Sequence, residues 1–294
     1  MRKLALPALT PVGVLSTCIA GVADPALVAR LDAIRGTLLA TAASYDQHAS
    51  ANALHLISRV ENVGAVTKDE LQSLYLDQMS ATKGSARSMY DVLRSAAPHR
   101  KCPLCGIGTV AVLDHHLPKS KYPDLAVCPF NLVPACDFCN NAKRASFPKT
   151  AGQQTIHPYY DDFTQEQWVY AKLDVDGPPA LSFFVKAPPH WDQTKRERAQ
   201  RHFDVVKLGL QYTSNANDDM TVLRDHLEGI KNGEGVAGVR AYLEDERDRN
   251  ASRVNSWQHV MYQTLANNAW FVNGGYLSIP LAFRRPLATS ATAM

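Results

Sequence analysis

The strongest constraint on this chain is a pair of C-x-x-C motifs, formed by Cys102 with Cys105 and by Cys136 with Cys139. Two sulfurs at this spacing can turn toward one metal ion, and two such pairs supply the four thiolates of a tetrahedral zinc site. Disulfide bonds of a secreted protein are the alternative. Short-spaced pairs are typical of metal ligands, so we favour a structural Zn²⁺.

A long and basic insert separates the two cysteine pairs. It contains 30 residues between Cys105 and Cys136, which exceeds the usual interval of a zinc ribbon. Residues 100–150 hold seven Lys and Arg against three Asp, a net charge of +4, while the whole chain carries only +3. The rest of the chain is therefore −1. Positive charge beside the cysteines fits a partner with phosphates, and a solvated basic loop explains it equally well.

The overall composition is that of a globular protein. The 294 residues are 46% hydrophobic and 20% charged, and no apolar run reaches the about 18 residues that cross a bilayer. Residues 1–23 resemble a signal peptide in part, since Arg2 and Lys3 precede an apolar stretch. Pro7 and Pro11 interrupt that stretch, so we expect an extended arm, no membrane association and a cytoplasmic protein.

Three regions differ in pattern, at residues 1–98, 99–150 and 151–294. The first is predicted to be helical, the second is the cysteine module, and the third is predicted to be a hairpin followed by helices. We therefore predict an α+β fold that is mainly helical. No flexible Gly/Ser linker divides the regions, which is compatible with one continuous body.

Local signals place several elements of the first region. Asp24 followed by Pro25 is a typical cap and first turn of a helix. A second helical stretch is expected over residues 44–60. Thr67 and Glu70 form a capping box that opens another helix.

Other signals place the elements of the third region. Residues 169–175 and 181–185 alternate in polarity around an Asp-Gly-Pro-Pro turn, which predicts a β-hairpin. Helices are expected from about Asp192 onward. The last ten residues are rich in Ala, Thr and Ser and are expected to form a loose tail.

The insert contains a recognisable set of polar residues. It reads D-H-H-L-P at 114–118, N-L at 131–132 and C-D-F-C-N-N-A-K at 136–143. This set resembles the HNH endonuclease family, whose pattern is D-H-x-x-P, then N-L, then C-x-x-C-[HN]-x-x-K. The resemblance spans residues 100–145 and implies a zinc-stabilised ββα-metal core, so that 99–150 would be a nuclease module between helical regions.

The resemblance implies a role for each matching residue. His115 would be the general base that activates water, and a neutral imidazole suits that task. Asp114 and Asn140 would hold one catalytic divalent cation. Asn131 would brace the loop that orients the histidine, and Lys143 would contact phosphate.

One position departs from the commoner family pattern, because Asn140 stands where a histidine is usual. An amide oxygen favours the hard ions Mg²⁺ or Mn²⁺ over softer metals.

The residues themselves agree with the core that the resemblance implies. A short strand from Val110 would deliver Asp114 and His115, and a bend must turn both toward one site. So small a core needs a metal staple, because it buries little apolar area alone.

Several residues have ordinary structural alternatives. His115 outside the motif would be read as a buried structural histidine, and His116 is read as a packing residue. Cys128 is expected to be a packed thiol. His157 begins a polar and aromatic cluster, which either closes over the site or forms a turn. Basic side chains are commonly exposed to solvent without binding a partner. The candidates for contact with nucleic acid are Lys119, Lys121, Lys143 and Arg144.

A longer stretch, from Cys102 to Asp161, resembles the HNH nuclease subunit of Septu-type and retron-linked anti-phage systems. That resemblance implies DNA cleavage in bacterial defence, beside an ATPase subunit. Cleavage of RNA or tRNA uses the same chemistry and stays open. A zinc-ribbon nucleic-acid-binding adaptor with an idle site is the alternative from another class, and it need not keep Asp114, His115, Asn131 and Asn140 together. Oligomeric state is not predicted.

Overall fold

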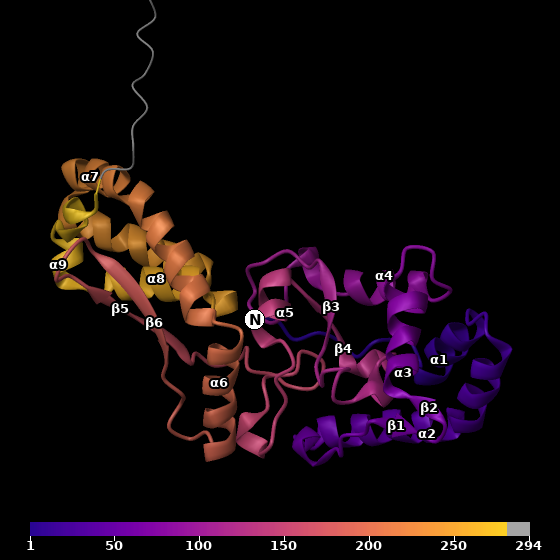
Figure 1. Cartoon of the computed structure of the whole chain (residues 1–294). Coiled ribbons are helices and arrows are strands. Elements are labelled where there is room, and N and C mark those ends of the chain that lie inside the picture. Colours follow the sequence, from indigo (N-terminus) through magenta and orange to yellow (C-terminus); the bar gives the residue numbers. More distant parts are fainter. Residues whose placement is uncertain (281–294) are drawn as a thin grey trace, which may run out of the picture. The chain divides into compact units, whose positions relative to one another are not determined.

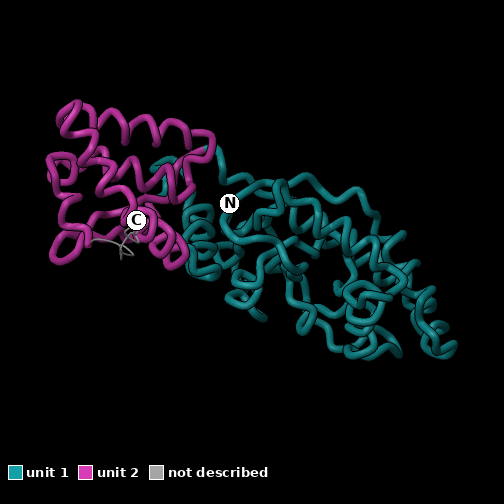
Figure 2. Tube along the Cα trace, turned by 90° about the horizontal axis from the view of Figure 1, so that it is seen from above, with its two compact units in different colours: residues 1–165, 187–208 teal, residues 166–186, 209–294 magenta. Residues whose placement is uncertain are grey.

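The computed structural model describes residues 1–280 and divides the chain into two compact units (Figure 2). Unit 1 contains residues 1–165 and 187–208, and unit 2 contains residues 166–186 and the chain from 209 onward. The regions 1–98 and 99–150 lie together in unit 1, whereas the third region is divided between the units. The loose tail expected for the last ten residues lies outside the described residues.

The first unit combines helices with two small antiparallel hairpins (Figure 1). Its helices are α1 (Pro11–Ala20), α2 (Pro25–Ser50), α3 (Lys68–Ser73), α4 (Arg87–Ser95), α5 (Asp137–Lys143) and α6 (Gln193–Val205). Its strands are β1 (Asn62–Val63) with β2 (Val66–Thr67), and β3 (Val112–His115) with β4 (Leu132–Ala135). Helices with small sheets agree with the predicted α+β, mainly helical class.

Helix α2 begins as predicted but is longer than expected. The Asp24 side chain accepts a hydrogen bond from the backbone N–H of Ala26, at 2.9 Å, and Pro25 is in the first turn. The separate helix expected over 44–60 is wrong, because α2 runs without a break to Ser50. Ala and Leu, which have high helix propensity, supply 11 of its 26 residues. Just beyond its end, Asn52 takes a left-handed φ of 56°.

The extended arm expected at residues 1–23 is also partly wrong, because α1 lies within it. Thr10 caps α1 by accepting a hydrogen bond from the N–H of Gly13, at 3.1 Å. Pro11 occupies the first turn, where its missing N–H costs nothing. The proline that looked like an interruption is therefore a helix start. The capping box of Thr67 and Glu70 is confirmed at the start of α3.

The core of unit 1 joins the N-terminal helices to the hairpin of β3 and β4. One cluster of buried residues includes Leu31 of α2, Leu71 of α3 and Leu93 of α4, together with Leu113 of β3 and Leu132 of β4. Burial of such apolar side chains stabilises the hairpin from outside the cysteine module. The cysteine cluster is therefore not the only support of this hairpin.

The second unit begins with the predicted hairpin, which is confirmed as β5 (Val169–Asp174) and β6 (Ala180–Val185). Its helices are α7 (Leu208–Arg249), which starts at the unit boundary, α8 (Trp257–Ala266) and α9 (Ala269–Val272). Gly235 interrupts α7 with a φ of 70°, a conformation that favours glycine. The Asn255 side chain accepts hydrogen bonds from the N–H groups of Trp168 and Val169 and so fixes the start of β5.

The helices after Asp192 are also confirmed. Asp192 caps α6 by accepting a hydrogen bond from the N–H of Lys195, at 2.8 Å. Among the residues that the structure describes, no helix is both long and apolar enough to cross a membrane.

Candidate functional site

The four paired cysteines come together on either side of β3 and β4. Cys102 and Cys105 lie in a tight turn before β3, where the N–H of Gly106 donates to the carbonyl of Cys102 at 2.7 Å. Gly106 has a φ of 77°, which a side chain would strain. Cys136 is the cap residue of α5 and Cys139 lies in its first turn. The cluster thus ties the turn to the start of α5.

The geometry of this cluster fits a tetrahedral metal ion. The ligand atoms of the four cysteines all lie within 4.8 Å of one another, and all four residues are buried. The sulfurs of Cys105 and Cys136 are 3.9 Å apart, and bonds of 2.3 Å to a tetrahedral zinc would place sulfurs about 3.8 Å apart. All four are free thiols without a disulfide. The cluster can therefore hold a metal ion such as zinc.

Gly108 keeps the space around these sulfurs open. A Cβ atom at this position would lie 2.7 Å from the sulfur of Cys136, which is too close for any side chain. The N–H of Gly108 points toward the sulfur of Cys105, at 3.4 Å. Hydrogen bonding among the four thiols lowers the pKa of Cys105 and Cys136 and raises the pKa of Cys102 and Cys139.

Strand β3, helix α5 and the loops that follow them line a cleft of about 400 Å³. Its lining includes Asp114 and His115 from β3, Asn140 from α5, and the basic residues Lys119 and Arg144. Neighbouring residues of a strand normally face opposite sides, yet Asp114 and His115 both border this cleft. The structure thus brings together five of the residues singled out in the sequence.

Lys143 lies behind the cleft in a buried ion pair. Its Nζ is 3.0 Å from Oδ2 of Asp114 and donates to the carbonyl of His115 at 2.6 Å. Burial raises the pKa of Asp114, and the charge of Lys143 opposes that shift. Lys143 does not line the cleft. This position differs from the phosphate contact that the resemblance implies. Lys121 lines another cavity.

His115 has a defined hydrogen-bonding state. Its Nε2 lies 2.8 Å from the carbonyl of Ala126, and a carbonyl only accepts, so Nε2 carries the hydrogen. The lone pair of the neutral ring is therefore at Nδ1. Burial lowers the pKa of His115 to about 3, so the ring is neutral at physiological pH. The ring of Tyr75 packs edge-on against it, with centroids 4.4 Å apart.

Asn131 braces the loop between the two strands. Its Oδ1 accepts from the N–H of Leu117 at 2.7 Å, and its Nδ2 donates to the carbonyls of Leu117 and Leu125. Leu125 precedes Ala126, whose carbonyl holds His115. Asn131 is fully buried and does not line the cleft, so its contacts are with the loop.

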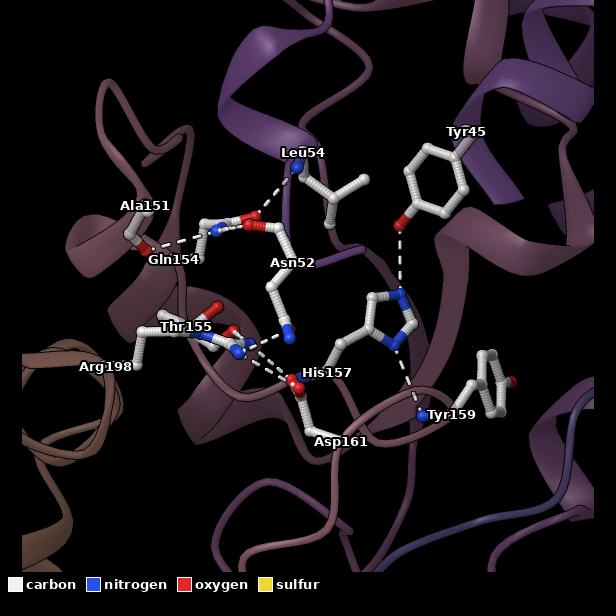
Figure 3. A network of polar contacts seen from close by, with 10 residues as sticks. All are labelled: Tyr45, Asn52, Leu54, Ala151, Gln154, Thr155, His157, Tyr159, Asp161 and Arg198. Atoms are coloured by element: carbon white, nitrogen blue, oxygen red, sulfur yellow. Dashed lines mark hydrogen bonds and ion pairs between the residues drawn. The ribbon is translucent and has the colours of Figure 1, made fainter. Parts of the chain in front are cut away.

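His116 and His157 form a packed pair behind the site. Their ring centroids are 4.1 Å apart. The Nδ1 of His157 accepts from the N–H of Tyr159, so its Nε2 carries the hydrogen that faces the hydroxyl of Tyr45 at 2.9 Å (Figure 3). Neither histidine lines the cleft. Of the two alternatives for the cluster at His157, the turn agrees with this placement.

A buried ion pair anchors the same turn to α6. Both carboxylate oxygens of Asp161 accept from Arg198, and one of them also accepts from the N–H of His157 at 2.7 Å (Figure 3). Gln154 adds hydrogen bonds to the N–H of Leu54 and to the carbonyl of Asn52, just beyond α2. The turn is therefore held rigidly between α2 and α6.

Two tyrosines of the cleft lie outside any motif. Tyr75 comes from the π-helical turn Leu74–Ser80 after α3, and Tyr90 comes from α4. The Tyr75 hydroxyl donates to the carbonyl of Leu113 in β3, at 3.3 Å. No local spacing could assign them to the site, because only the tertiary packing of the N-terminal helices brings them there.

One curated relative covers nearly the whole chain. The chain is 31% identical over 296 residues to "Protein ea31" of Escherichia phage lambda, and the match covers 93% of this chain and 100% of that protein. No protein-family model and no solved structure matches the chain.

Proposed function

The chain belongs to the family of the phage lambda protein Ea31, and we propose that it is a metal-dependent HNH endonuclease. The observation that carries the proposal is the cleft itself. It gathers Asp114, His115 and Asn140 with the basic residues Lys119 and Arg144. An acid, an imidazole and an amide beside two cations suit hydrolysis of a phosphodiester.

The proposed core consists of β3, β4 and α5. The cysteine cluster supports this proposal, because it links α5 to the turn before β3. A structural metal ion at this position would stabilise a ββα-metal core. In this reading the ion held by the four cysteines is a structural Zn²⁺, since four thiolates leave no open position for water or substrate.

The catalytic steps follow from the side chains around the cleft. Nδ1 of His115 accepts a proton from the water that attacks phosphorus, the bond from phosphorus to the leaving 3′ oxygen breaks, and that oxygen takes a proton from solvent. The hydrogen bond to Ala126 fixes the orientation of the ring. Asp114 and Asn140 offer the oxygen ligands that Mg²⁺ or Mn²⁺ prefers, and such an ion supplies charge stabilisation at the scissile phosphate. Lys119 and Arg144 hold the phosphate backbone in place.

We propose DNA as the substrate and anti-phage defence beside an ATPase subunit as the setting, on the subfamily resemblance alone. RNA or tRNA cleavage by the same cleft is the second candidate. An adaptor with an idle site is the third. The relative Ea31 is a phage protein, so the defence setting has no support from this comparison.

The test is cleavage of supercoiled plasmid by the purified full chain with Mg²⁺ or Mn²⁺. The decisive variant is His115→Asn, which removes the imidazole together with the hydrogen bond that its Nε2 makes to the carbonyl of Ala126. The matched control is His226→Asn, at an exposed position of α7. Zinc content and circular dichroism of each variant show whether it folds.

We expect metal-dependent nicking or linearisation by the parent and the control, and a loss of about 10²-fold or more in His115→Asn. Equal cleavage by all three chains assigns the activity elsewhere and overturns the mechanism. Cleavage of RNA but not of plasmid by the parent selects the second candidate. A folded parent that binds nucleic acid and cuts neither substrate selects the adaptor.

A further inference from the structure

A second and larger cavity lies in unit 1, with a volume of about 600 Å³. We call it the flanking groove. Its basic lining residues are His55 and Arg59, which follow α2, Lys121 from the loop after β3, and Lys149 from the segment after α5. Its acidic lining residue is Glu61. The groove therefore carries a net positive charge.

The positive charges of the flanking groove are not neutralised. Glu61 is paired with Lys68, at 3.2 Å. Within residues 1–280, Arg59, Lys121 and Lys149 have no carboxylate partner in an ion pair, and Nδ1 of His55 is buried without a hydrogen-bond partner. Uncompensated cations that share a concave surface attract anions more strongly than cations scattered over a convex one.

The groove also has an aromatic wall. The Arg59 guanidinium lies over the ring of Phe147, 5.1 Å from its centroid, and this ring meets Tyr122 edge-on. The stacked guanidinium keeps its hydrogen-bond donors at its edges, where they can reach a phosphate. Arg59 is thus positioned by the aromatic ring and does not depend on a salt bridge.

The flanking groove and the proposed active-site cleft are lined by the same two loops. Ser120 lines the cleft and the next residue, Lys121, lines the groove. Likewise Ala145 lines the cleft, and Phe147 lines the groove. Consecutive Cα atoms are about 3.8 Å apart, so each of these two loops contributes to both cavities within about two residues.

We propose that the flanking groove binds the phosphodiester backbone of the nucleic acid on one side of the scissile bond. This inference rests on the proposed function, because it takes the strand cut at His115 as its ligand. DNA carries one phosphate per about 3.4 Å of each strand, so a strand in the cleft reaches the groove within a few nucleotides. Three or more phosphates then meet Arg59, Lys121 and Lys149 in turn.

The test measures binding without cleavage, in a full chain that carries His115→Asn and without added Mg²⁺. The probe is a fluorescein-labelled DNA duplex, and anisotropy gives Kd between about 50 and 200 mM KCl. The test variant adds Arg59→Gln, Lys121→Gln and Lys149→Gln. The matched control instead adds three substitutions of exposed cations outside both cavities: Lys83→Gln, Lys172→Gln and Arg253→Gln.

We expect the test variant to bind about 10-fold or more weakly, and its slope of log K against log[salt] to fall in magnitude by about 2 to 3, since each lost phosphate contact removes about 0.9. The control should change neither quantity. Equal Kd and slope in the His115→Asn chain and in the test variant overturn the inference. Failure of the His115→Asn chain to bind the duplex overturns it as well. Displacement of the duplex by inorganic phosphate, beyond that by KCl of equal ionic strength, also overturns it, since the groove would then hold free anions.

Failure of the proposed function has a different signature. If the chain without the His115 substitution binds DNA but never cuts it, while the three glutamines still weaken binding, the groove is retained and the nuclease proposal fails.

Discussion

The ammonium of Lys143 lies 3.0 Å from the carboxylate of Asp114, and both side chains are buried although Asp114 borders the proposed cleft. The same ammonium donates to the carbonyl of His115. One side chain from α5 therefore neutralises the acid of β3 and fixes the backbone of the histidine beside it. The charge of Asp114 is balanced before any divalent ion arrives, so such an ion must share this carboxylate with Lys143.

The first prediction concerns removal of this ammonium. Lys143→Met leaves the carboxylate of Asp114 buried without a counter-charge, and we expect a loss of about 3–5 kcal/mol in the free energy of unfolding. The double variant Lys143→Met/Asp114→Asn should recover part of that loss, because no buried charge remains. Chemical denaturation measures both.

The control for this variant is Lys172→Met, which breaks the exposed pair of Lys172 with Asp174. Solvent and salt screen an exposed pair, so its loss should change stability little. A loss this small in Lys143→Met would show that the buried pair contributes no more than a surface one.

The second prediction concerns the cysteine cluster. The purified chain should contain one zinc ion, and Cys139→Ser should lose it and unfold at a lower temperature, because metal that binds only the folded state stabilises it. Cys128→Ala is the matched control. Burial raises the pKa of Cys128 to about 12, so this residue is a neutral thiol at physiological pH. Equal zinc content in the parent and in Cys139→Ser, by elemental analysis, would argue against the four-cysteine site.

The starts of several elements could be predicted from the sequence because their causes are local. Asp24 caps α2 through its own side chain, and Thr67 and Glu70 bond to each other's backbone across three residues. The spacing of Cys102 and Cys105 likewise contains the turn that brings their sulfurs together. Each of these interactions spans a few residues, so the pattern and the structure coincide.

Other features depend on packing between distant segments and leave no local pattern. Tyr75 and Tyr90 reach the cleft because the N-terminal helices share a core with β3 and β4. Arg59 and Lys149 line the same groove although 90 positions separate them in the chain. The sequence did not predict the burial of Lys143 either, since a lysine in a short helix is most often exposed.

The third prediction concerns the pH dependence of stability. Burial lowers the pKa of His157 to about 3, against an ordinary value of 6.5. Below pH 6.5 the imidazole of His157 binds a proton in the unfolded chain but stays neutral in the folded chain. The free energy of unfolding therefore falls with decreasing pH until about pH 3. Within that window His157 contributes about 1.4 kcal/mol per pH unit.

The measurement is the free energy of unfolding in urea at several pH values between these limits. His157→Phe should reduce the slope by about one proton, although it also loses the contact with Tyr45. Tyr45→Phe removes the same hydrogen bond without removing a histidine, so it should lower stability and keep the slope. Identical slopes in the parent and in His157→Phe would mean that His157 is protonated in the folded chain.

The last prediction separates two neighbouring amides of α5. Asn140 lines the cleft with Asp114, whereas Asn141 is exposed and lines neither cavity. If an amide oxygen helps to hold the catalytic ion, Asn140→Ala should raise the Mg²⁺ concentration for half-maximal plasmid cleavage about 10-fold or more. Asn141→Ala should leave this concentration unchanged, because Asn141 does not line the cleft. It is a matched control, since both variants alter the helix propensity of α5 equally. Equal effects of the two substitutions would mean that they act through the stability of α5, and the metal would then depend on Asp114 without an amide partner.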